Sequence, residues 1–346
     1  MGIKLLVTTG PGLQPGPDGY VLVVDWQCRR VIDRWRFTHS VYRQSHKGLA
    51  GASVAGGTLL VAAEAELLKL EMAPLRLVDR RTFRFLNDVH HISVSDGRIW
   101  VCNTGLDCLE EFDAEWRLVQ THDLIRPFGR KARHLARLLP HDMRKSWRRM
   151  TGHYDYYQHL PYRPPFRNVA KLLRPGVYRN NGRDLRKCDF RPHFLHPNYI
   201  CPVGDDIWVT LFFSGEVVSL KQKCVVLSGL GRPHDGVVVD GWHYVTDCAA
   251  NRVVVRQKPD HDRPARTIAE RRVTNDLSEG FLRGICPAGE YVFVGLTARR
   301  GAPDPYRAAR IVMLHAGTLE FVDQWVVPEK YGLGLFSIVD VTELYR

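Results

Sequence analysis

The stretch Asn87–Leu106, NDVHHISVSDGRIWVCNTGL, contains the pattern from which the fold can be predicted. Two short runs rich in β-branched and aromatic residues, HHISVS and RIWVCN, stand on either side of Asp96 and Gly97. Runs of this length are typical of β-strands, and an Asp-Gly pair between them is typical of a tight hairpin turn. We therefore expect two antiparallel strands here, followed by a second turn after Asn103.

The same pattern recurs at residues 48–67, 196–216, 232–252 and 281–301. The copies align on the valine that ends the second run, at Val61, Val101, Val209, Val245 and Val294. The residue before that valine is aromatic in four copies (Trp100, Trp208, Tyr244 and Phe293), which predicts packing between repeats. With the strands that follow, each copy spans roughly 40–50 residues, the length of a four-stranded propeller blade.

The two ends of the chain complete this pattern. Residues 3–9, 20–25 and 30–37 read as the second, third and fourth strands of a blade that lacks its innermost strand. Residues 335–341 can supply it, and such pairing would close the ring without a free sheet edge. We expect one all-β domain over residues 1–346, a six-bladed β-propeller, with five or seven blades as alternatives.

The segment Val245–Arg256, VTDCAANRVVVR, resembles the NHL-type repeat. The six-bladed layout resembles the superfamily of NHL, gluconolactonase-like and strictosidine-synthase-like propellers. The resemblance implies the fold and no particular activity, because this fold hosts many unrelated functions. The carboxylate and Asn metal ligands typical of gluconolactonase-like enzymes are not reproduced. Only Asn198 stands where such a ligand could be, so lactonase activity is not implied.

The positive charge of the chain is concentrated in one segment. The whole chain has 49 Lys and Arg against 37 Asp and Glu, a net charge of +12. Residues 125–192 contain 18 of the basic and 4 of the acidic residues, a net of +14, so the remainder is near neutral at −2. An anionic macromolecular partner is therefore expected at this segment and not at the body of the protein.

We expect residues 125–192 to form a mainly helical insertion between the third and fourth blades. Residues 130–139 and 141–150 read as two short helices, and the aromatic, Pro-rich residues 154–166 as a packed lid. Three roles are open. The insertion could be a solvated cap, a cap that helps to admit an anionic substrate, or a surface for a nucleic acid, an acidic protein or an anionic lipid.

Targeting signals and cysteine pairs are not evident in the sequence. The apolar run after Met1 is too short for a signal peptide, and no run reaches the ~18 apolar residues of a transmembrane segment. None of the eight cysteines forms a C-x-x-C pair. Most of them read as free, often buried thiols. We expect a cytoplasmic protein, and the oligomeric state stays open.

The candidate site lies where the first strand of each blade begins. These strands line the central channel of a propeller, so their first residues meet at one mouth. The alignment puts His90, Asn198, His234 and Arg283 in one column, with Ala50 in the weaker copy. Close to this column in the sequence are Asp88, His91, His193, His196 and Asp235. His91 is expected to be structural, because side chains alternate along a strand.

This column supports two kinds of chemistry. Neutral imidazoles that meet across a channel can bind a divalent transition metal, Zn²⁺ or Fe²⁺, with His90, His196, His234 and Asn198 as ligands. Without a metal, His90 or His234 could transfer protons, with Asp88 or Asp235 orienting the ring. In both cases Arg283 suits the carboxylate or phosphate of a substrate, and His193, His196 and Asn198 could contact it.

Two functions follow as hypotheses. The first is an enzyme that acts on a small anionic molecule at the channel mouth, with the reaction type undetermined. The second is a non-catalytic binding propeller that uses residues 125–192 as its partner surface. No nucleotide cofactor is expected, because the sequence has no P-loop and no glycine-rich loop between a strand and a helix.

Overall fold

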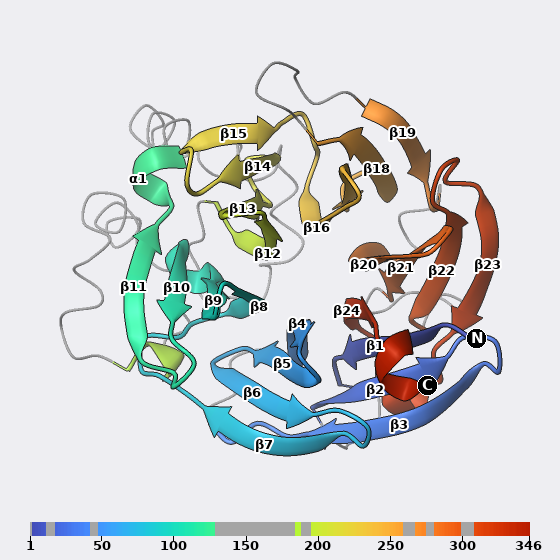
Figure 1. The fold of residues 1–346 in the computed structure, drawn as a ribbon, viewed down its shortest axis with the longest axis horizontal. Helices are drawn as coiled ribbons and strands as arrows, with labels where there is room; N and C mark the ends of the chain where they lie inside the picture. The colour runs from blue at the N-terminus through green and yellow to red at the C-terminus, as the bar shows by residue number, and fades with distance from the viewer. Residues whose placement is uncertain are drawn as a thin grey trace, which may run out of the picture.

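The computed structural model of the protein describes residues 2–11, 18–41, 48–128, 184–187, 195–258, 267–274, 280–298 and 308–346. Within these residues, six antiparallel four-stranded sheets surround a central axis (Figure 1). The chain is therefore an all-β, six-bladed propeller. The prediction of six blades, rather than five or seven, is confirmed.

Each blade is given from its innermost to its outermost strand. Blade 1 contains β24 (Leu335–Asp340), β1 (Lys4–Thr9), β2 (Gly19–Asp25) and β3 (Arg30–Phe37). Blade 2 contains β4 (Leu49–Ala55), β5 (Thr58–Ala63), β6 (Glu66–Glu71) and β7 (Arg76–Arg81). Blade 3 contains β8 (Val89–Ser95), β9 (Arg98–Asn103), β10 (Cys108–Phe112) and β11 (Leu118–Asp123).

The second half of the ring has the same order. Blade 4 contains β12 (Pro197–Val203), β13 (Asp206–Leu211), β14 (Glu216–Ser219) and β15 (Cys224–Leu227). Blade 5 contains β16 (Pro233–Val239), β17 (Trp242–Asp247), β18 (Arg252–Gln257) and β19 (Thr267–Arg272). Blade 6 contains β20 (Phe281–Ala288), β21 (Tyr291–Thr297), β22 (Arg310–His315) and β23 (Phe321–Val326).

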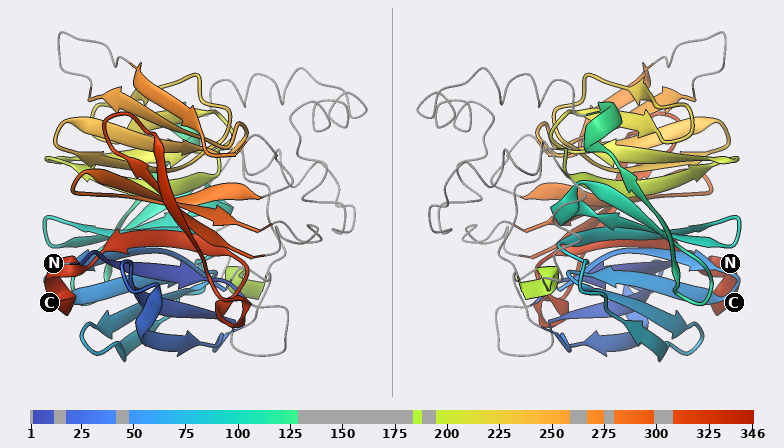
Figure 2. Two further views of the ribbon diagram at one scale, coloured as in Figure 1. Left: turned by 90° about the vertical axis from the view of Figure 1, so that its right-hand side faces the viewer. Right: turned by 90° about the vertical axis from the view of Figure 1, so that its left-hand side faces the viewer.

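Blade 1 closes the ring by pairing the two ends of the chain. Strand β24 lies antiparallel to β1, with Val7 opposite Ile338 and Leu5 opposite Asp340. Residue Lys4 adds a hydrogen bond from its N–H to Thr342 Oγ1 at 3.0 Å. The two chain ends accordingly lie on the same face of the ring (Figures 1 and 2). The closure expected from residues 335–341 is thus confirmed.

The strand pairing confirms the sequence alignment. The five aligned valines lie opposite equivalent inner-strand residues: Val61 opposite Ala52, Val101 opposite Ile92, Val209 opposite Ile200, Val245 opposite Gly236 and Val294 opposite Ile285. Just before this pair, the register shifts by one residue in every inner strand, including β24. Such a bulge changes the direction of the side chains next to it.

The hydrophobic core consists of clusters between neighbouring blades. One cluster joins Phe293 of blade 6 to Trp26 and Leu22 of blade 1, with the Trp26 and Phe293 rings 4.9 Å apart. The predicted aromatic column lies in these interfaces, where Phe293, Trp208 and Tyr244 are buried and Trp100 packs at the edge of its cluster. Inter-blade packing thus fixes the inner strands around the channel.

The predicted helices at 130–139 and 141–150 and the aromatic stretch at 154–166 lie outside the described residues. The described parts of this segment are α1 (Ile125–Phe128) and η2 (Leu185–Lys187). Residue Leu185 donates its N–H to Arg84 O and accepts from Asn87 Nδ2, both at 2.7 Å. Element η2 therefore lies beside the start of β8, on the face opposite to the chain ends (Figure 2).

Seven of the eight cysteines are described, and these seven are free thiols. Residues Cys102, Cys108, Cys201 and Cys286 are buried, as expected for small apolar side chains.

In the described part of the chain, no helix has the length and apolar character that crossing a membrane requires.

Candidate functional site

The six inner strands place equivalent residues around one mouth of the channel, on the face where these strands begin. The column consists of Ala50, His90, Asn198, His234, Arg283 and Phe336, all with at most 9% of their surface exposed. The alignment predicted the first five. It missed Phe336, because the composite blade 1 is split between the two ends of the chain and was not aligned.

Three of the predicted histidines come together on neighbouring blades. The ring of His90 lies 4.7 Å from that of His196 and 6.2 Å from that of His234, measured between ring centroids. The ring of His196 also packs against Phe212 and Phe213, at 5.2 and 4.9 Å. The fourth candidate, His193, lies outside the described residues.

The hydrogen bonds of two histidines define which ring nitrogen is basic. In His90, Nδ1 lies 2.9 Å from the backbone oxygen of Asp88, and in His234, Nδ1 lies 3.0 Å from Oδ2 of Asp235. A carbonyl or carboxylate oxygen accepts, so Nδ1 carries the proton and Nε2 is the basic nitrogen of the neutral ring. Residue Asp88 thus orients His90 through its backbone, since its carboxylate oxygen is 4.0 Å away.

Asp235 is held by three donors. Its Oδ2 accepts from His234 Nδ1, from Thr246 Oγ1 at 3.2 Å and from the Gly284 N–H at 2.8 Å. Burial by itself raises the pKa of this carboxyl, but His234, the Gly284 amide and the charge of Arg283 outweigh burial and lower the pKa. The carboxylate therefore stays ionised, and it can stabilise a positive charge on His234.

Arg283 is a buried cation without an ion pair in the described structure. Its Cζ lies 4.9 Å from the ring centre of Phe281 and 4.8 Å from that of Phe336, and 9% of its surface is exposed. No carboxylate oxygen of the described residues lies within 4 Å of its guanidinium, and Nε has no hydrogen-bond partner. A buried guanidinium is costly unless an anion accompanies it.

Asn198 is a second unsatisfied polar group in the column. Its side chain is 1% exposed, and neither Oδ1 nor Nδ2 has a hydrogen-bond partner in the described structure. Buried side-chain amides are nearly always hydrogen-bonded. An orphaned amide at the channel mouth therefore favours a bound ligand or water as its partner.

His196 adopts a backbone conformation that L-residues seldom use. Its φ is +55°, in the left-handed region, and its N–H donates to Asp107 Oδ1 at 2.9 Å. Strain of this kind clusters at ligand sites. The rings of Phe212 and Phe213 form a wall beside it, which sequence reasoning missed. The only available signal was the apolar pair that directly follows β13.

The neighbouring His91 serves the packing of the ring. Its Nδ1 accepts from the Ile200 N–H at 3.3 Å, and its ring lies 4.0 Å from that of Tyr199 on the next blade. Burial lowers the pKa of His91 to about 4, so the ring is neutral near neutral pH. These contacts fit the structural role expected for His91.

The described residues do not assemble the predicted metal site. Among them, no three His, Cys, Asp or Glu side chains lie close enough together to hold a metal ion. Zinc or iron at His90, His196, His234 and Asn198 therefore stays a prediction.

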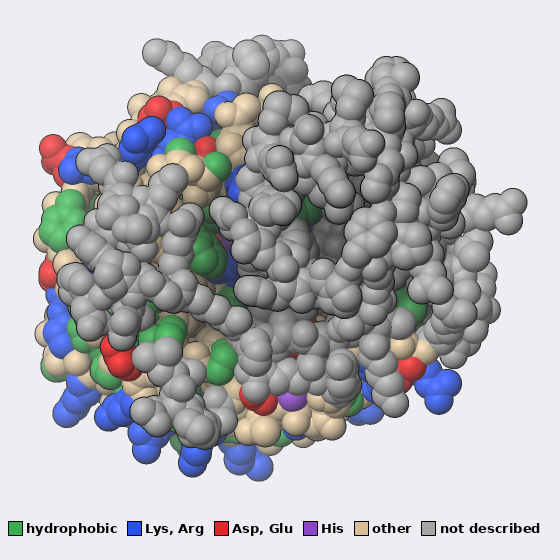
Figure 3. All heavy atoms as spheres, turned by 180° about the vertical axis from the view of Figure 1, so that it is seen from behind, with side chains coloured by type: hydrophobic (Ala, Val, Ile, Leu, Met, Phe, Trp, Pro, Cys, Tyr) green, Lys and Arg blue, Asp and Glu red, His purple; other side chains and the backbone are tan. Residues whose placement is uncertain are grey.

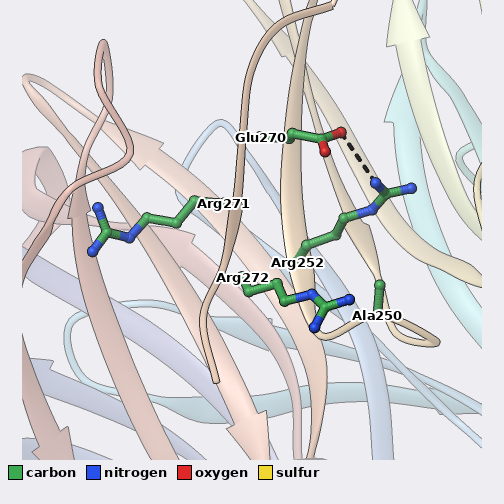
Figure 4. Close-up of a pocket in the computed structure, with 5 residues that line it drawn as sticks. All are labelled: Ala250, Arg252, Glu270, Arg271 and Arg272. Atoms are coloured by element: carbon green, nitrogen blue, oxygen red, sulfur yellow. Dashed lines mark hydrogen bonds and ion pairs between the residues drawn. The ribbon is translucent and has the colours of Figure 1, made fainter. Parts of the chain in front are cut away.

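A separate hollow of about 260 Å³ lies on the outer part of blade 5 (Figure 4). It is lined by Ala250, Arg252, Glu270, Arg271 and Arg272. Its Arg252 is neutralised by Glu270 at 3.1 Å and by Asp247 at 3.0 Å, and Arg271 points away from that pair in the figure. The hollow therefore lacks the buried, unpaired groups of the channel mouth, and we place the candidate site at the mouth.

The face that contains the mouth has a positively charged edge. Lys and Arg side chains gather along the lower edge in Figure 3, over β3 and β7. These two outer strands contain six arginines and two aspartates. The three arginines of β7 pair with Glu71, Glu66 and Asp79, so the positive charge that favours the approach of anions comes mainly from β3.

Comparisons with known proteins show the fold. No family model matches the chain, and no curated protein matches it. A chain of a nidogen–laminin complex is 10% identical, with 98% of both chains covered and a TM-score of 0.56. A putative 6-phosphogluconolactonase from Bacteroides fragilis is 10% identical, with 94% of this chain and 82% of that chain covered and a TM-score of 0.51.

Both are propeller proteins, one described as an enzyme and the other part of a protein complex. At these identities the likeness concerns the fold alone, which is compatible with an enzyme and with a binding protein.

Proposed function

We propose that this protein is an enzyme that acts on a small anionic molecule at the channel mouth. The observation that carries the proposal is Arg283, a buried guanidinium with no carboxylate partner in the described structure. It shares its column with the two oriented histidines, His90 and His234. A substrate anion would supply the missing partner.

Arg283 would act as the anion clamp. Its guanidinium lies close to two phenylalanine rings, Phe281 and Phe336, which restricts its orientation. The planar fork matches a carboxylate or phosphate through two parallel hydrogen bonds. The amide of Asn198 would donate to, or accept from, the same molecule, and His196 with Phe212 would form the wall of the site.

His234 would transfer the proton. Its Nδ1–H is fixed on the ionised Asp235, so Nε2 can accept a proton from the substrate while Asp235 stabilises the imidazolium. His90 is oriented through the carbonyl of Asp88 and would return or donate a proton from the neighbouring blade. The reaction class supported by these groups is proton transfer, which is common to hydrolysis, elimination and isomerisation.

The test of the anion clamp is Arg283→Gln, with Arg252→Gln as the matched control because Arg252 already has two carboxylate partners. Binding of propionate and inorganic phosphate would be measured by calorimetry. We expect Arg283→Gln to weaken binding by about tenfold or more, and Arg252→Gln to leave it unchanged. Equal binding by wild type and Arg283→Gln would refute the clamp.

The test of catalysis is His234→Gln. Turnover of a panel of hydroxy acids, lactones and carboxylate esters would be followed by NMR. A proton-transfer group contributes roughly 10²–10⁴-fold, so kcat should fall by at least about 10²-fold with little change in KM. Anion binding without turnover of any panel member by wild type would favour the second hypothesis, a non-catalytic binding propeller. Its proposed partner surface, 125–192, remains a prediction.

A further inference from the structure

A second arginine, Arg232, lies at the edge of the mouth beside His234. Its backbone is fixed, because its N–H donates to Asp247 Oδ1 at 3.0 Å and its carbonyl accepts from Cys248 N at 2.9 Å. Its Cζ lies 5.9 Å from the ring centre of Phe212. That ring in turn lies 6.3 Å from the ring of His234. The guanidinium of Arg232 therefore lies near Phe212, the side chain that also packs near His234.

Neither Arg232 nor Arg283 forms an ion pair with a described residue. No carboxylate oxygen of the described residues lies within 4 Å of either guanidinium, whereas Arg252 on the same blade has two such partners. The carboxylate of Asp247, which accepts from the Arg232 backbone N–H, also accepts from the Gly231 N–H and from Arg252. The carboxylate that could have paired with Arg232 is thus already engaged.

The charges of Arg232 and Arg283 both act on the same residue, Cys248. The thiol of Cys248 donates to the backbone oxygen of Leu282 at 2.8 Å and so lies between blades 5 and 6. Burial and the charges of Asp235 and Asp247 raise the pKa of this thiol, while the charges of Arg283 and Arg232 act to lower it. Both cations are therefore close to one thiol, which follows β17 next to the mouth.

We infer that the ligand of this site has two anionic groups, as a dicarboxylate does, with one on the buried Arg283 and the other on Arg232 at the rim. This inference rests on the proposed function. Neither guanidinium has a carboxylate of the described residues in direct contact, so the two acidic groups of a dianion could each pair with one arginine. His234, on the blade between Phe212 and Arg283, would then face the part of the ligand that joins the two acidic groups.

The experiment compares propionate with succinate and glutarate by calorimetry at matched ionic strength. The variants are Arg232→Gln and Arg283→Gln. Arg271→Gln serves as the control, since it removes the same charge from the outer hollow and leaves the mouth intact. We expect wild type and Arg271→Gln to bind one of the dicarboxylates about tenfold or more tightly than propionate.

The variants separate the two claims. Arg232→Gln should lower dicarboxylate affinity to the level of propionate and leave propionate binding unchanged, while Arg283→Gln should weaken both. Equal affinity for propionate and both dicarboxylates, unchanged in Arg232→Gln, would overturn the dianion and leave the proposed function standing. If Arg283→Gln binds propionate and both dicarboxylates as tightly as wild type, the proposed function is refuted, and the dianion inference with it.

Discussion

Two neighbouring positions on the inner strands differ in how their polar side chains are hydrogen-bonded. At the mouth position His90 and His234 each bond through Nδ1 within their own blade, whereas the Asn198 amide and Nε of Arg283 have no partners in the described structure. The following position contains His91, Asp235 and Ser337, and each of them bonds to the next blade around the ring. His91 accepts from Ile200 N at 3.3 Å, Asp235 accepts from Gly284 N at 2.8 Å, and Ser337 donates to Ala52 O at 3.4 Å.

This difference separates two tasks within single strands. We call the following position the ring-closing row and the mouth position the open row. The ring-closing row contributes to stability, while the open row retains polar groups that cost stability unless a ligand meets them. Functional sites commonly retain unpaired polar groups, and this lowers the stability of the fold.

The largest effect is expected from Asp235→Ala, which removes one acceptor from three donors at once. Leaving His234, Thr246 and Gly284 without this carboxylate should lower the free energy of unfolding by about 3–5 kcal/mol. Urea denaturation measures it. The control Thr246→Val removes one donor to this carboxylate and the acceptor of the Asp235 N–H, and it should cost about 2 kcal/mol. A loss below that of the control would show that Asp235 does not hold blades 5 and 6 together.

The second effect is a loss of stability in weak acid. Burial lowers the pKa of His91 to about 4 and that of His243 to about 3. The unfolded chain binds these protons near pH 6.5, so stability is complete above that pH and decreases as the pH falls toward the folded pKa values. Each histidine should contribute about 2 kcal/mol between about pH 7 and pH 5.

Unfolding free energies measured over that range check this prediction. In His91→Gln the part of the dependence that comes from these two histidines should be about half as steep, because only His243 of the pair remains. A stability that stays constant from neutral pH to pH 5 would contradict a neutral, buried His91.

A smaller effect is expected from Gly284→Ala. Gly284 has φ +74°, and an added Cβ would lie 3.1 Å from the Ile338 backbone nitrogen, so the amide that holds Asp235 must move. The control is Gly289→Ala, which also has positive φ (+58°) but no atom within 4 Å of the new Cβ. Gly289→Ala should cost about 1 kcal/mol and Gly284→Ala roughly twice that. Equal decreases in melting temperature for the two variants would show that the Gly284 amide does not contribute to the contact between blades 5 and 6.

The smallest effect, and one of opposite sign, is expected from Asn198→Leu. Replacing an unsatisfied buried amide by an apolar side chain of similar size should leave stability unchanged or raise it by about 1 kcal/mol, while anion binding weakens. The control Asn251→Leu breaks a bond from Nδ2 to Gly280 O at 2.9 Å and should lower stability. If Asn198→Leu is as destabilising as Asn251→Leu, the Asn198 amide is not an unsatisfied group.

The sequence was sufficient to predict the blades, the closure and most of the open row. Alternating apolar residues and Asp-Gly turns are local signals, and the register of Val101 opposite Ile92 follows from them. The bulge in each inner strand, and the contact of Asp235 with Gly284, depend on how closely adjacent blades approach. They could not be predicted from a single repeat.

Other parts of the site could not be predicted from the sequence for similar reasons. Residue Phe336 belongs to a blade that is divided between the chain ends. The role of Arg232 becomes visible only in its contact with Phe212 of the neighbouring blade. The sequence also could not show that Arg252 is neutralised while Arg283 is not, because that difference depends on Asp247 and Glu270 across the sheet.

The most direct test of the open row is the unfolding free energy of Arg283→Met, compared with wild type, with and without succinate at about 100 times its Kd. Without the anion, the variant should be more stable by about 1 kcal/mol, because an apolar chain replaces an unpaired buried charge. With succinate, wild type should gain about 2–3 kcal/mol and the variant almost nothing. A variant that is less stable than wild type, and that gains as much from succinate, would contradict an anion site at Arg283.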